Sequence, residues 1–241
     1  MIGITFALRS ESSDLVSRLQ TRQSHHNLIS GKIDNPEMIG ARESLRSRDV
    51  TIGHTGVGAK NCNERLEALL HKTRPRLVIS SGFAGAISEQ LDVGDLILAE
   101  NFSDPGLLAS AERILRDREP RVVKLFTSAS IIDSVAERNE IARAADAAAV
   151  DMETGAIADL CKIHGVPLLS LRIVSDTANQ PFPAPPSVLF DIERQRTNFG
   201  GLLAYLLREP GSVGRLFRFG RQIARARARL TDAIVAVVRE L

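Results

Sequence analysis

The chain has 241 residues, of which 44% are hydrophobic and 25% are charged, and its formal net charge is +2. This length and composition are typical of one large α/β domain with an ample buried core. No apolar run approaches the length that spans a bilayer, and the chain enters a predicted strand without a signal peptide, so we expect a cytoplasmic protein.

Short apolar runs alternate with amphipathic stretches along the chain. The apolar runs predict strands at residues 2–8, 50–55, 76–80, 96–99, 122–125, 147–150 and 168–174. The amphipathic stretches predict helices at residues 12–23, 59–72 and 154–164. This alternation predicts a three-layer α/β domain, in which the last two strands and the helix between them form a β-α-β unit. The proline-rich segment 181–186 predicts a rigid loop that forms a wall of the site or leads into the next helix.

The cysteines and histidines do not have the spacing of a metal site. Cys62 and Cys161 lie far apart on predicted helices, and the adjacent His25 and His26 have no cysteine or further histidine close to them. We therefore expect no metal and no cofactor, and two reduced cysteines that serve packing in a reducing compartment.

Two carboxylates follow predicted buried strands closely. Glu153 comes just after the strand at residues 147–150, and Asp176 comes just after the strand at residues 168–174. In open α/β sheets, ligands bind beyond the carboxyl ends of the strands, which favours a functional site here. The alternative is structural, with Glu153 capping or ion-pairing the following helix and Asp176 serving as an N-cap or turn residue.

The runs that contain these acids resemble known signatures. Residues 150–156 (VDMETGA) and 171–178 (LRIVSDTA) are similar to the V-E-M-E-A-T-A and R-A-I-S-D-x-A runs of the purine nucleoside phosphorylase superfamily, in particular its methylthioadenosine/S-adenosylhomocysteine nucleosidase branch. Residues 2–11, 54–58, 81–86 and 93–96 resemble further motifs of the family in the same order. The resemblance implies a three-layer phosphorylase/hydrolase-like fold with a mixed central sheet flanked by helices.

The resemblance also implies roles for the two acids. Cleavage of a bond between ribose C1′ and a purine nitrogen passes through a sugar with oxocarbenium character, so the departing base needs an acid and the sugar needs a stabilising group. Asp176 matches the aspartate that protonates or hydrogen-bonds purine N7, which requires a buried environment that keeps a proton on it or shares one with it. Glu153 matches the acid that accepts hydrogen bonds from the ribose hydroxyls. Met152 packs against the sugar or, alternatively, only fills the core.

Glu11 distinguishes two reaction types. It matches the glutamate that activates water in the nucleosidases, whereas the phosphorylases have no carboxylate there and carry an arginine to hold phosphate. At the arginine position this chain has Ser80, and Phe83 replaces a small hydroxyl residue. We therefore expect hydrolysis. The alternative is a solvated Glu11 in the first turn of a helix, with Arg9 binding phosphate.

The expected site combines these acids with their neighbours. The catalytic residues are Asp176 and Glu11. The substrate-binding residues are Glu153, Met152, Phe83, Ala84, Gly85, Ser175 and Ile132.

Two departures from the nucleosidase pattern affect the substrate. The segment between Asp95 and Thr127 is shorter than its family counterpart, which predicts a more open 5′ side. The base-pocket turn, which we place at residues 128–133, lacks the aromatic residue of the family. The preference for adenine therefore rests on Asp176 and on the general resemblance.

The C-terminus is strongly basic, with eight arginines and three acidic residues from Arg208 to Leu241. Apolar residues recur there at helical spacing and arginines recur on another face, which predicts a basic amphipathic helix at residues 211–241, an extension of a domain at residues 1–210. Three interpretations stay open: packing on its own domain or on a sister subunit, contact with an anionic membrane surface, and nucleic-acid binding, which the lack of stacking aromatics on the basic face disfavours. Together with the short middle segment, this tail resembles hopanoid-associated nucleoside phosphorylase-like proteins, which release adenine from adenosylhopane.

These observations predict a cytoplasmic purine nucleosidase that releases adenine from a 5′-modified adenosine. A peripheral position at the inner membrane surface is the alternative that the basic tail leaves open. The substrate is methylthioadenosine/S-adenosylhomocysteine-like or adenosylhopane-like. The alternatives are phosphorolysis of purine nucleosides and a non-catalytic nucleoside-binding or membrane-associated module. The expected partner is a small-molecule purine nucleoside, with no nucleic acid, and we expect a homo-oligomer, a dimer or higher.

Overall fold

The computed structural model describes residues 1–35, 47–132, 134–181, 190–191, 196–197 and 212–241. Its main sheet is mixed and has the strand order β2-β3-β4-β1-β5-β10-β6-β7, with β9 pairing β5 and β8. The strands are β1 (Ile2–Phe6), β2 (Gln20–His25), β3 (Leu28–Asp34), β4 (Ser47–His54), β5 (Val78–Ala86), β6 (Leu96–Ala99), β7 (Arg121–Val123), β8 (Leu125–Thr127), β9 (Ala149–Asp151) and β10 (Leu168–Asp176). A separate two-stranded sheet joins β11 (Phe190–Asp191) to β12 (Arg196–Thr197).

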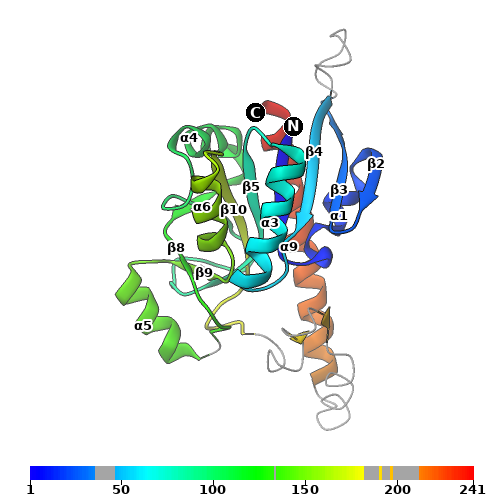
Figure 1. Cartoon of the computed structure of the whole chain (residues 1–241). Coiled ribbons are helices and arrows are strands. Elements are labelled where there is room, and N and C mark those ends of the chain that lie inside the picture. Colours follow the sequence, from blue (N-terminus) through cyan, green and yellow to red (C-terminus); the bar gives the residue numbers. More distant parts are fainter. Residues whose placement is uncertain (36–46, 133, 182–189, 192–195, 198–211) are drawn as a thin grey trace.

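Helices cover both faces of the main sheet (Figure 1). They are α1 (Arg9–Ser17), α3 (Ala59–Thr73), α4 (Pro105–Ile114), α5 (Val135–Ala145), α6 (Thr154–Ile163) and α9 (Ser212–Glu240), with a short 3-10 helix at Arg116–Arg118. One face carries α1, α4 and α9, and the other carries α3 and α6. The expected mixed sheet flanked by helices is thereby confirmed. Within the described residues, no helix is long and apolar enough to cross a membrane.

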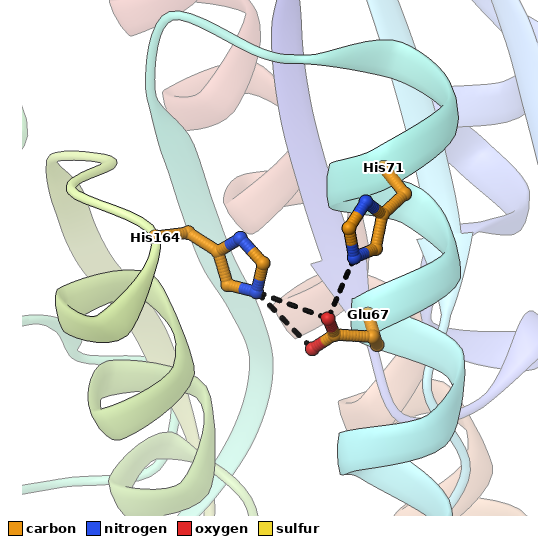
Figure 2. Close-up of side chains that lie close together, drawn as sticks. All are labelled: Glu67, His71 and His164. Carbon is orange, nitrogen blue, oxygen red and sulfur yellow. Dashed lines mark hydrogen bonds and ion pairs between the residues drawn. The ribbon is translucent and has the colours of Figure 1, made fainter.

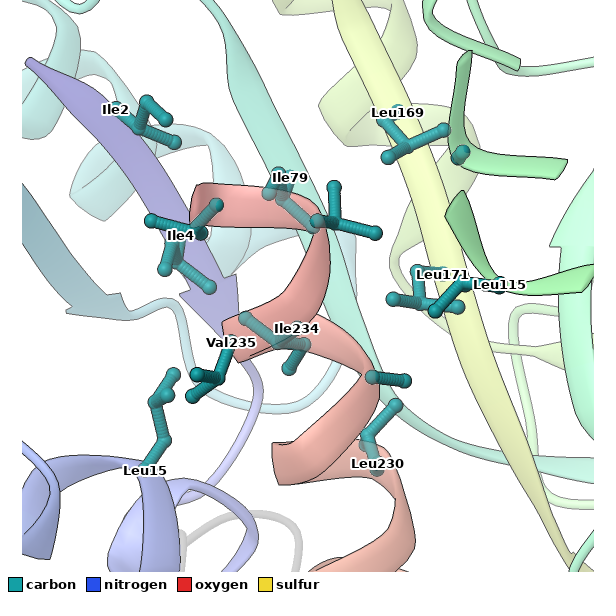
Figure 3. Close-up of a cluster of buried hydrophobic side chains, with 14 of the residues drawn as sticks. Ile2, Ile4, Leu15, Ile79, Leu115, Leu169, Leu171, Leu230, Ile234 and Val235 are labelled. Carbon is teal, nitrogen blue, oxygen red and sulfur yellow. The ribbon is translucent and has the colours of Figure 1, made fainter. Parts of the chain in front are cut away.

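The largest core cluster lies between the sheet and the helices α1, α4 and α9 (Figure 3). Strand residues such as Ile4 and Ile79 contribute to it, as do Leu15 of α1 and Leu230 and Ile234 of α9. Leu230 is 1% exposed and Ile234 is fully buried. The second half of α9 is therefore part of the main core, which agrees with the packing interpretation of the C-terminal helix for that half.

The first half of α9 lies outside this core. Val213 and Phe217 are 56% and 66% exposed, and the arginines at positions 218, 221 and 225 are exposed as well. The boundary expected at residue 210 and the proline-rich loop beyond residue 181 lie outside the described residues.

Two predictions about secondary structure are wrong. The helix expected at residues 12–23 begins earlier and ends at Ser17, because the polar residues from Gln20 to His25 pair with β3 as an exposed edge strand. The unit around α6 is not a parallel β-α-β unit. β9 runs antiparallel to β5 while β10 runs parallel to it, so β9 and β10 run in opposite directions.

Candidate active site

A cavity of about 270 Å³ lies where β5 and β10 end. Its walls come from the β1–α1 connection, the end of β5, the segment before α5, the β9–α6 connection and the end of β10. All nine residues that the sequence places in the site line this cavity: Glu11, Phe83, Ala84, Gly85, Ile132, Met152, Glu153, Ser175 and Asp176. Segments far apart in the sequence thus meet at one hollow.

Glu11 lies in the first turn of α1 and is only 7% exposed. Its Oε2 accepts a hydrogen bond of 2.8 Å from the Leu8 N–H, and its Oε1 accepts one of 3.2 Å from the Phe83 N–H. Burial raises the pKa of Glu11, although these hydrogen bonds and the charge of Arg172 act in the opposite direction. Glu11 is therefore not a solvated surface acid. Arg9 is exposed, donates to the His26 carbonyl and does not line the cavity.

Gly82 allows Glu11 to come this close to β5. Its φ of +139° belongs to a region that L side chains rarely adopt. A Cβ atom there would lie 2.9 Å from Arg172 Nη1 and 3.0 Å from Glu11 Oε1. The glycine thus leaves room beside β5 for the Glu11 carboxylate, which lines the cavity, and for the Arg172 guanidinium.

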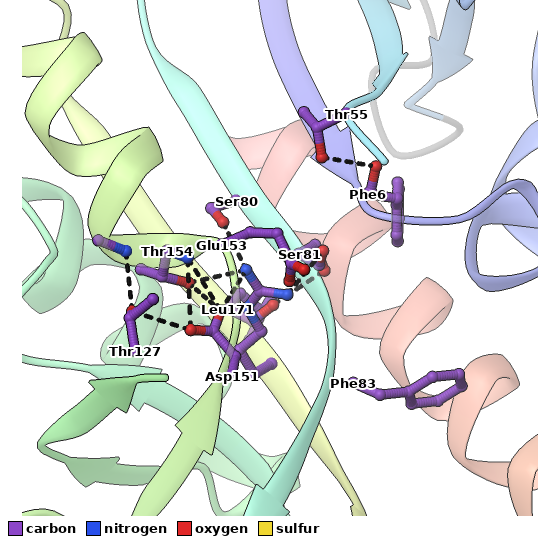
Figure 4. Close-up of polar contacts among 12 residues, drawn as sticks. Phe6, Thr55, Ser80, Ser81, Phe83, Thr127, Asp151, Glu153, Thr154 and Leu171 are labelled. Atoms are coloured by element: carbon purple, nitrogen blue, oxygen red, sulfur yellow. Dashed lines mark hydrogen bonds and ion pairs between the residues drawn. The ribbon is translucent and has the colours of Figure 1, made fainter. Parts of the chain in front are cut away.

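Phe83 contributes to the site mainly through its backbone. Its N–H binds Glu11, while its ring points toward α9 (Figure 4) and packs against the main core. The position therefore offers phosphate no hydroxyl and no charge.

Glu153 lies at the N-cap of α6 and is 6% exposed. Its Oε1 accepts a 3.0 Å hydrogen bond from the N–H of Gly58, in the turn before α3, where a φ of +86° favours glycine. Burial, and then the negative charge of Asp151, raise the pKa of Glu153 to about 7. At neutral pH this carboxyl is therefore close to its titration midpoint and can accept hydrogen bonds when it ionises.

Arg172 and Asp151 form a buried ion pair to which sequence reasoning assigned no role. Their side chains are 2% and 1% exposed, and Arg172 Nη2 lies 2.8 Å from Asp151 Oδ2. Arg172 also donates to the Ser80 hydroxyl at 2.8 Å and to the Thr154 hydroxyl at 2.7 Å. The contacts of Asp151, Thr154 and Ser80 are drawn in Figure 4. Arg172 is not part of the cavity lining, but its positive charge opposes the rise in the pKa values of Glu11 and Glu153.

Asp176 has a buried cationic partner, Arg138, that sequence reasoning missed. Arg138 Nη2 lies 2.5 Å from Asp176 Oδ2, and the two side chains are 3% and 2% exposed. Arg138 also donates to the carbonyls of Ala86 and Ile132, and the Ser175 hydroxyl donates to Asp176 Oδ1 at 2.6 Å. Arg138 is the one buried residue of α5. Its only sequence signal is an arginine one turn into a polar helix, which is typical of a solvated side chain.

This pairing adds a fixed partner to the expected acid. A guanidinium and a hydroxyl donor hold the carboxyl group of Asp176 in one orientation in the lining of the cavity. This position suits a group that exchanges a proton with a bound base.

The fold and this carboxylate-lined cavity define the chain as an α/β protein with an enzyme-like site at its strand ends. A family model described as Phosphorylase superfamily matches residues 41–104 and 99–208. The chain belongs to the phosphorylase superfamily.

Two curated relatives, from Staphylococcus haemolyticus and Staphylococcus aureus strain MRSA252, are named 5'-methylthioadenosine/S-adenosylhomocysteine nucleosidase. Each is 28% identical to this chain, over 211 and 207 residues, and each match covers 74% of this chain and 87% of the relative.

Two solved structures share the fold of this chain. An S-adenosylhomocysteine nucleosidase from Streptococcus pyogenes in complex with 5-methylthiotubericidin has a TM-score of 0.72 at 19% identity, covering 100% of this chain and 96% of that one. The futalosine hydrolase of Helicobacter pylori strain 26695 has a TM-score of 0.69 at 15% identity, covering 100% and 97%.

Proposed function

We propose that this protein hydrolyses the N-glycosidic bond of a 5′-modified adenosine and releases adenine. The observation that carries the proposal is the convergence of Glu11, Glu153 and Asp176 on one cavity, each buried and each with different hydrogen-bond partners. Three carboxylates with separate environments suit the three tasks of this reaction, which are activating water, stabilising the sugar and protonating the base. The names of the curated relatives support this reaction class.

In the proposed reaction, Glu11 orients a water molecule and accepts its proton as the water oxygen bonds to C1′. The bond from C1′ to the purine nitrogen breaks, and the electron pair goes to the base. Asp176 takes up a proton from solvent before cleavage and delivers it to purine N7 as the base departs, and Arg138 stabilises the carboxylate that results. Glu153 accepts hydrogen bonds from the ribose hydroxyls, and these strengthen as positive charge develops on the sugar. Met152 and Ile132 supply apolar walls.

The charges around the cavity favour water over phosphate as the nucleophile. Among the described residues that line it, Arg138 is the only cation, and its charge is compensated by Asp176. Arg172 lies below the lining and is held by Asp151. Phosphate binding normally uses charge-assisted hydrogen bonds from free cationic groups, whereas Glu11 and Glu153 repel an anion when they are ionised.

We propose that the 5′-modified substrate is methylthioadenosine/S-adenosylhomocysteine-like or adenosylhopane-like. No described residue of the segment from Asp95 to Thr127 lines the cavity, which supports an open 5′ side.

Product analysis with and without phosphate tests the proposal. Purified full-length protein is incubated with methylthioadenosine, S-adenosylhomocysteine and adenosine, and adenine and the sugar product are quantified by chromatography. Hydrolysis gives adenine and free sugar in equal amounts at the same rate in both buffers. Ribose 1-phosphate-type products that depend on phosphate would support phosphorolysis instead, and binding without turnover of any nucleoside would support the non-catalytic alternative.

We also propose that the first half of α9 contacts an anionic membrane surface. Val213 and Phe217 are exposed apolar side chains at this end. Exposed arginines at positions 218, 221, 225 and 229 line a hollow of about 640 Å³ beside the turn at residues 92–94. Basic and apolar side chains on one exposed helix are typical of interfacial helices. Gln222 on the same helix donates to the Ser175 carbonyl, so the hollow adjoins the catalytic cavity.

Liposome co-sedimentation of the full chain tests this contact. Removing residues 211–241 would be unsuitable, because the second half of α9 is in the core. Each arginine near an anionic surface contributes about 1 kcal/mol, so the double change Arg221→Gln and Arg225→Gln should weaken binding roughly 30-fold. The control, Arg22→Gln with Lys72→Gln, makes the same change in net charge elsewhere. Equal binding by both variants would discard the contact.

The expected homo-oligomer stays a prediction that light scattering tests.

A further inference from the structure

Glu67, His71 and His164 form a cluster between helix α3 and the end of helix α6 (Figure 2), and none of the three lines the cavity. Glu67 and His71 lie one turn apart on α3, and His164 is the C-cap of α6. His71 Nε2 lies 2.8 Å from Glu67 Oε1, and His164 Nε2 lies 3.1 and 3.2 Å from the two carboxylate oxygens. Both imidazoles thus place their Nε2 atom next to the Glu67 carboxylate.

The cluster offers ligand atoms that suit a transition-metal ion. One coordinating atom from each residue lies within 4.8 Å of the other two. Bonds of about 2.0–2.2 Å in a tetrahedral zinc site separate neighbouring ligand atoms by about 3.3 Å. The nitrogen–oxygen distances here are already close to that value, so small side-chain rotations would admit an ion.

The ligand types are also suitable. The Glu67 carboxylate has the Nε2 atom of each imidazole within hydrogen-bond distance. Two imidazoles and one carboxylate are a set that zinc and related divalent ions accept, with water completing the shell.

Packing between α3 and α6 fixes the relative position of the three proposed ligands. Cys62, Leu66 and Leu69 of α3 pack against Ile157 and Cys161 of α6 in one buried cluster. The ligands therefore come from two elements whose relative position is fixed by the core, which reduces the ordering cost of binding.

We propose that Glu67, His71 and His164 bind one divalent transition-metal ion of the Zn²⁺ type. The ion would clamp the C-terminal ends of α3 and α6 together. The opposite ends of these helices meet at the catalytic cavity, where the Gly58 N–H donates to Glu153. The role is structural and independent of the proposed hydrolysis.

Isothermal titration of full-length, chelator-treated protein with Zn²⁺ tests the site, together with thermal unfolding. Wild-type protein should bind one ion per chain, and at a free concentration about 100 times Kd the Tm should rise by about 5–10 °C, reversibly on adding chelator. His71→Ala and His164→Ala should each weaken binding at least about tenfold, since even residues behind metal ligands have effects of that size.

His26→Ala is the matched control, because His26 is an exposed histidine next to His25 and outside the cluster. It should bind Zn²⁺ like the wild type. The side chains of His71 and Glu67 are 68% and 41% exposed, so their variants should fold, and Glu67→Gln provides a further variant that keeps the shape. The proposal is overturned if the wild type binds no stoichiometric ion, if the cluster variants bind as tightly as the wild type, or if binding is lost in His26→Ala instead.

Discussion

Removing the charge of Arg138 should destabilise the folded protein strongly. Arg138→Met keeps much of the apolar stem but leaves the Asp176 carboxylate buried without its cation. The side chains of this pair are 3% and 2% exposed and 2.5 Å apart, so solvent cannot replace the lost partner. Breaking a fully buried pair from one side costs about 3–5 kcal/mol. We expect a loss of that size in the free energy of unfolding.

Urea unfolding at pH 7 measures this loss, and a double-mutant cycle assigns it to the pair. Asp176→Asn in the Arg138→Met background removes the uncompensated charge, so it should recover part of the stability that Arg138→Met alone loses. Two results would refute the reasoning: an Arg138→Met protein within about 1 kcal/mol of the wild type, or additive effects of the two substitutions.

Three further predictions concern pH, the C-terminal helix and the thiols. The native pKa of Glu153, about 7, exceeds the ordinary value of 4.5, so the native state binds more protons than the unfolded state between these pH values. The contribution of Glu153 to the free energy of unfolding is therefore complete below pH 4.5 and is lost as the pH rises through 7, by roughly 3 kcal/mol. Urea titrations across this range should show that loss in the wild type and not in Glu153→Gln. Leu230→Ala should cost about 2–5 kcal/mol because Leu230 is 1% exposed, whereas Phe217→Ala, at an exposed position of the same helix, should stay within about 0.5 kcal/mol; equal effects would contradict the division of α9 into a core half and an exposed half. Burial raises the pKa values of Cys62 and Cys161 to about 12, so a thiol reagent should label neither in native protein at pH 8 and both after denaturation.

Much of the fold could be predicted because its central strands are buried on both faces. Such strands are continuous apolar runs, and the run at residues 96–99 coincides with β6. Edge strands lack this signal. Residues from Gln20 to His25 are all exposed and polar, and only their pairing with β3 makes them a strand. The direction of β9 depends on hydrogen bonds to the end of β5, more than sixty residues away, which local periodicity does not record.

Some residues of the site could also be predicted from the sequence, and others could not. Glu11, Glu153 and Asp176 could be located because each lies in a motif at or just after the end of a strand or in a helix's first turn. Arg138 could not, since its partner Asp176 is 38 residues away and the surrounding helix is polar. Arg172 lies within a recognised motif, but its role depends on Asp151, Ser80 and Thr154 meeting across three elements. Buried ion pairs join residues that the sequence separates, so an arginine in the sequence shows its charge but not its partner.

The central claim is that Glu11 activates water for cleavage of the glycosidic bond. The most direct measurement compares adenine release by the wild type, Glu11→Gln and the control Glu64→Gln in phosphate-free buffer, with nucleoside binding measured in parallel. Glu64 is an exposed acid of α3, so its variant should match the wild type. We predict that Glu11→Gln lowers kcat at least about 100-fold while the Kd for the nucleoside changes little. Wild-type turnover by Glu11→Gln would contradict the claim.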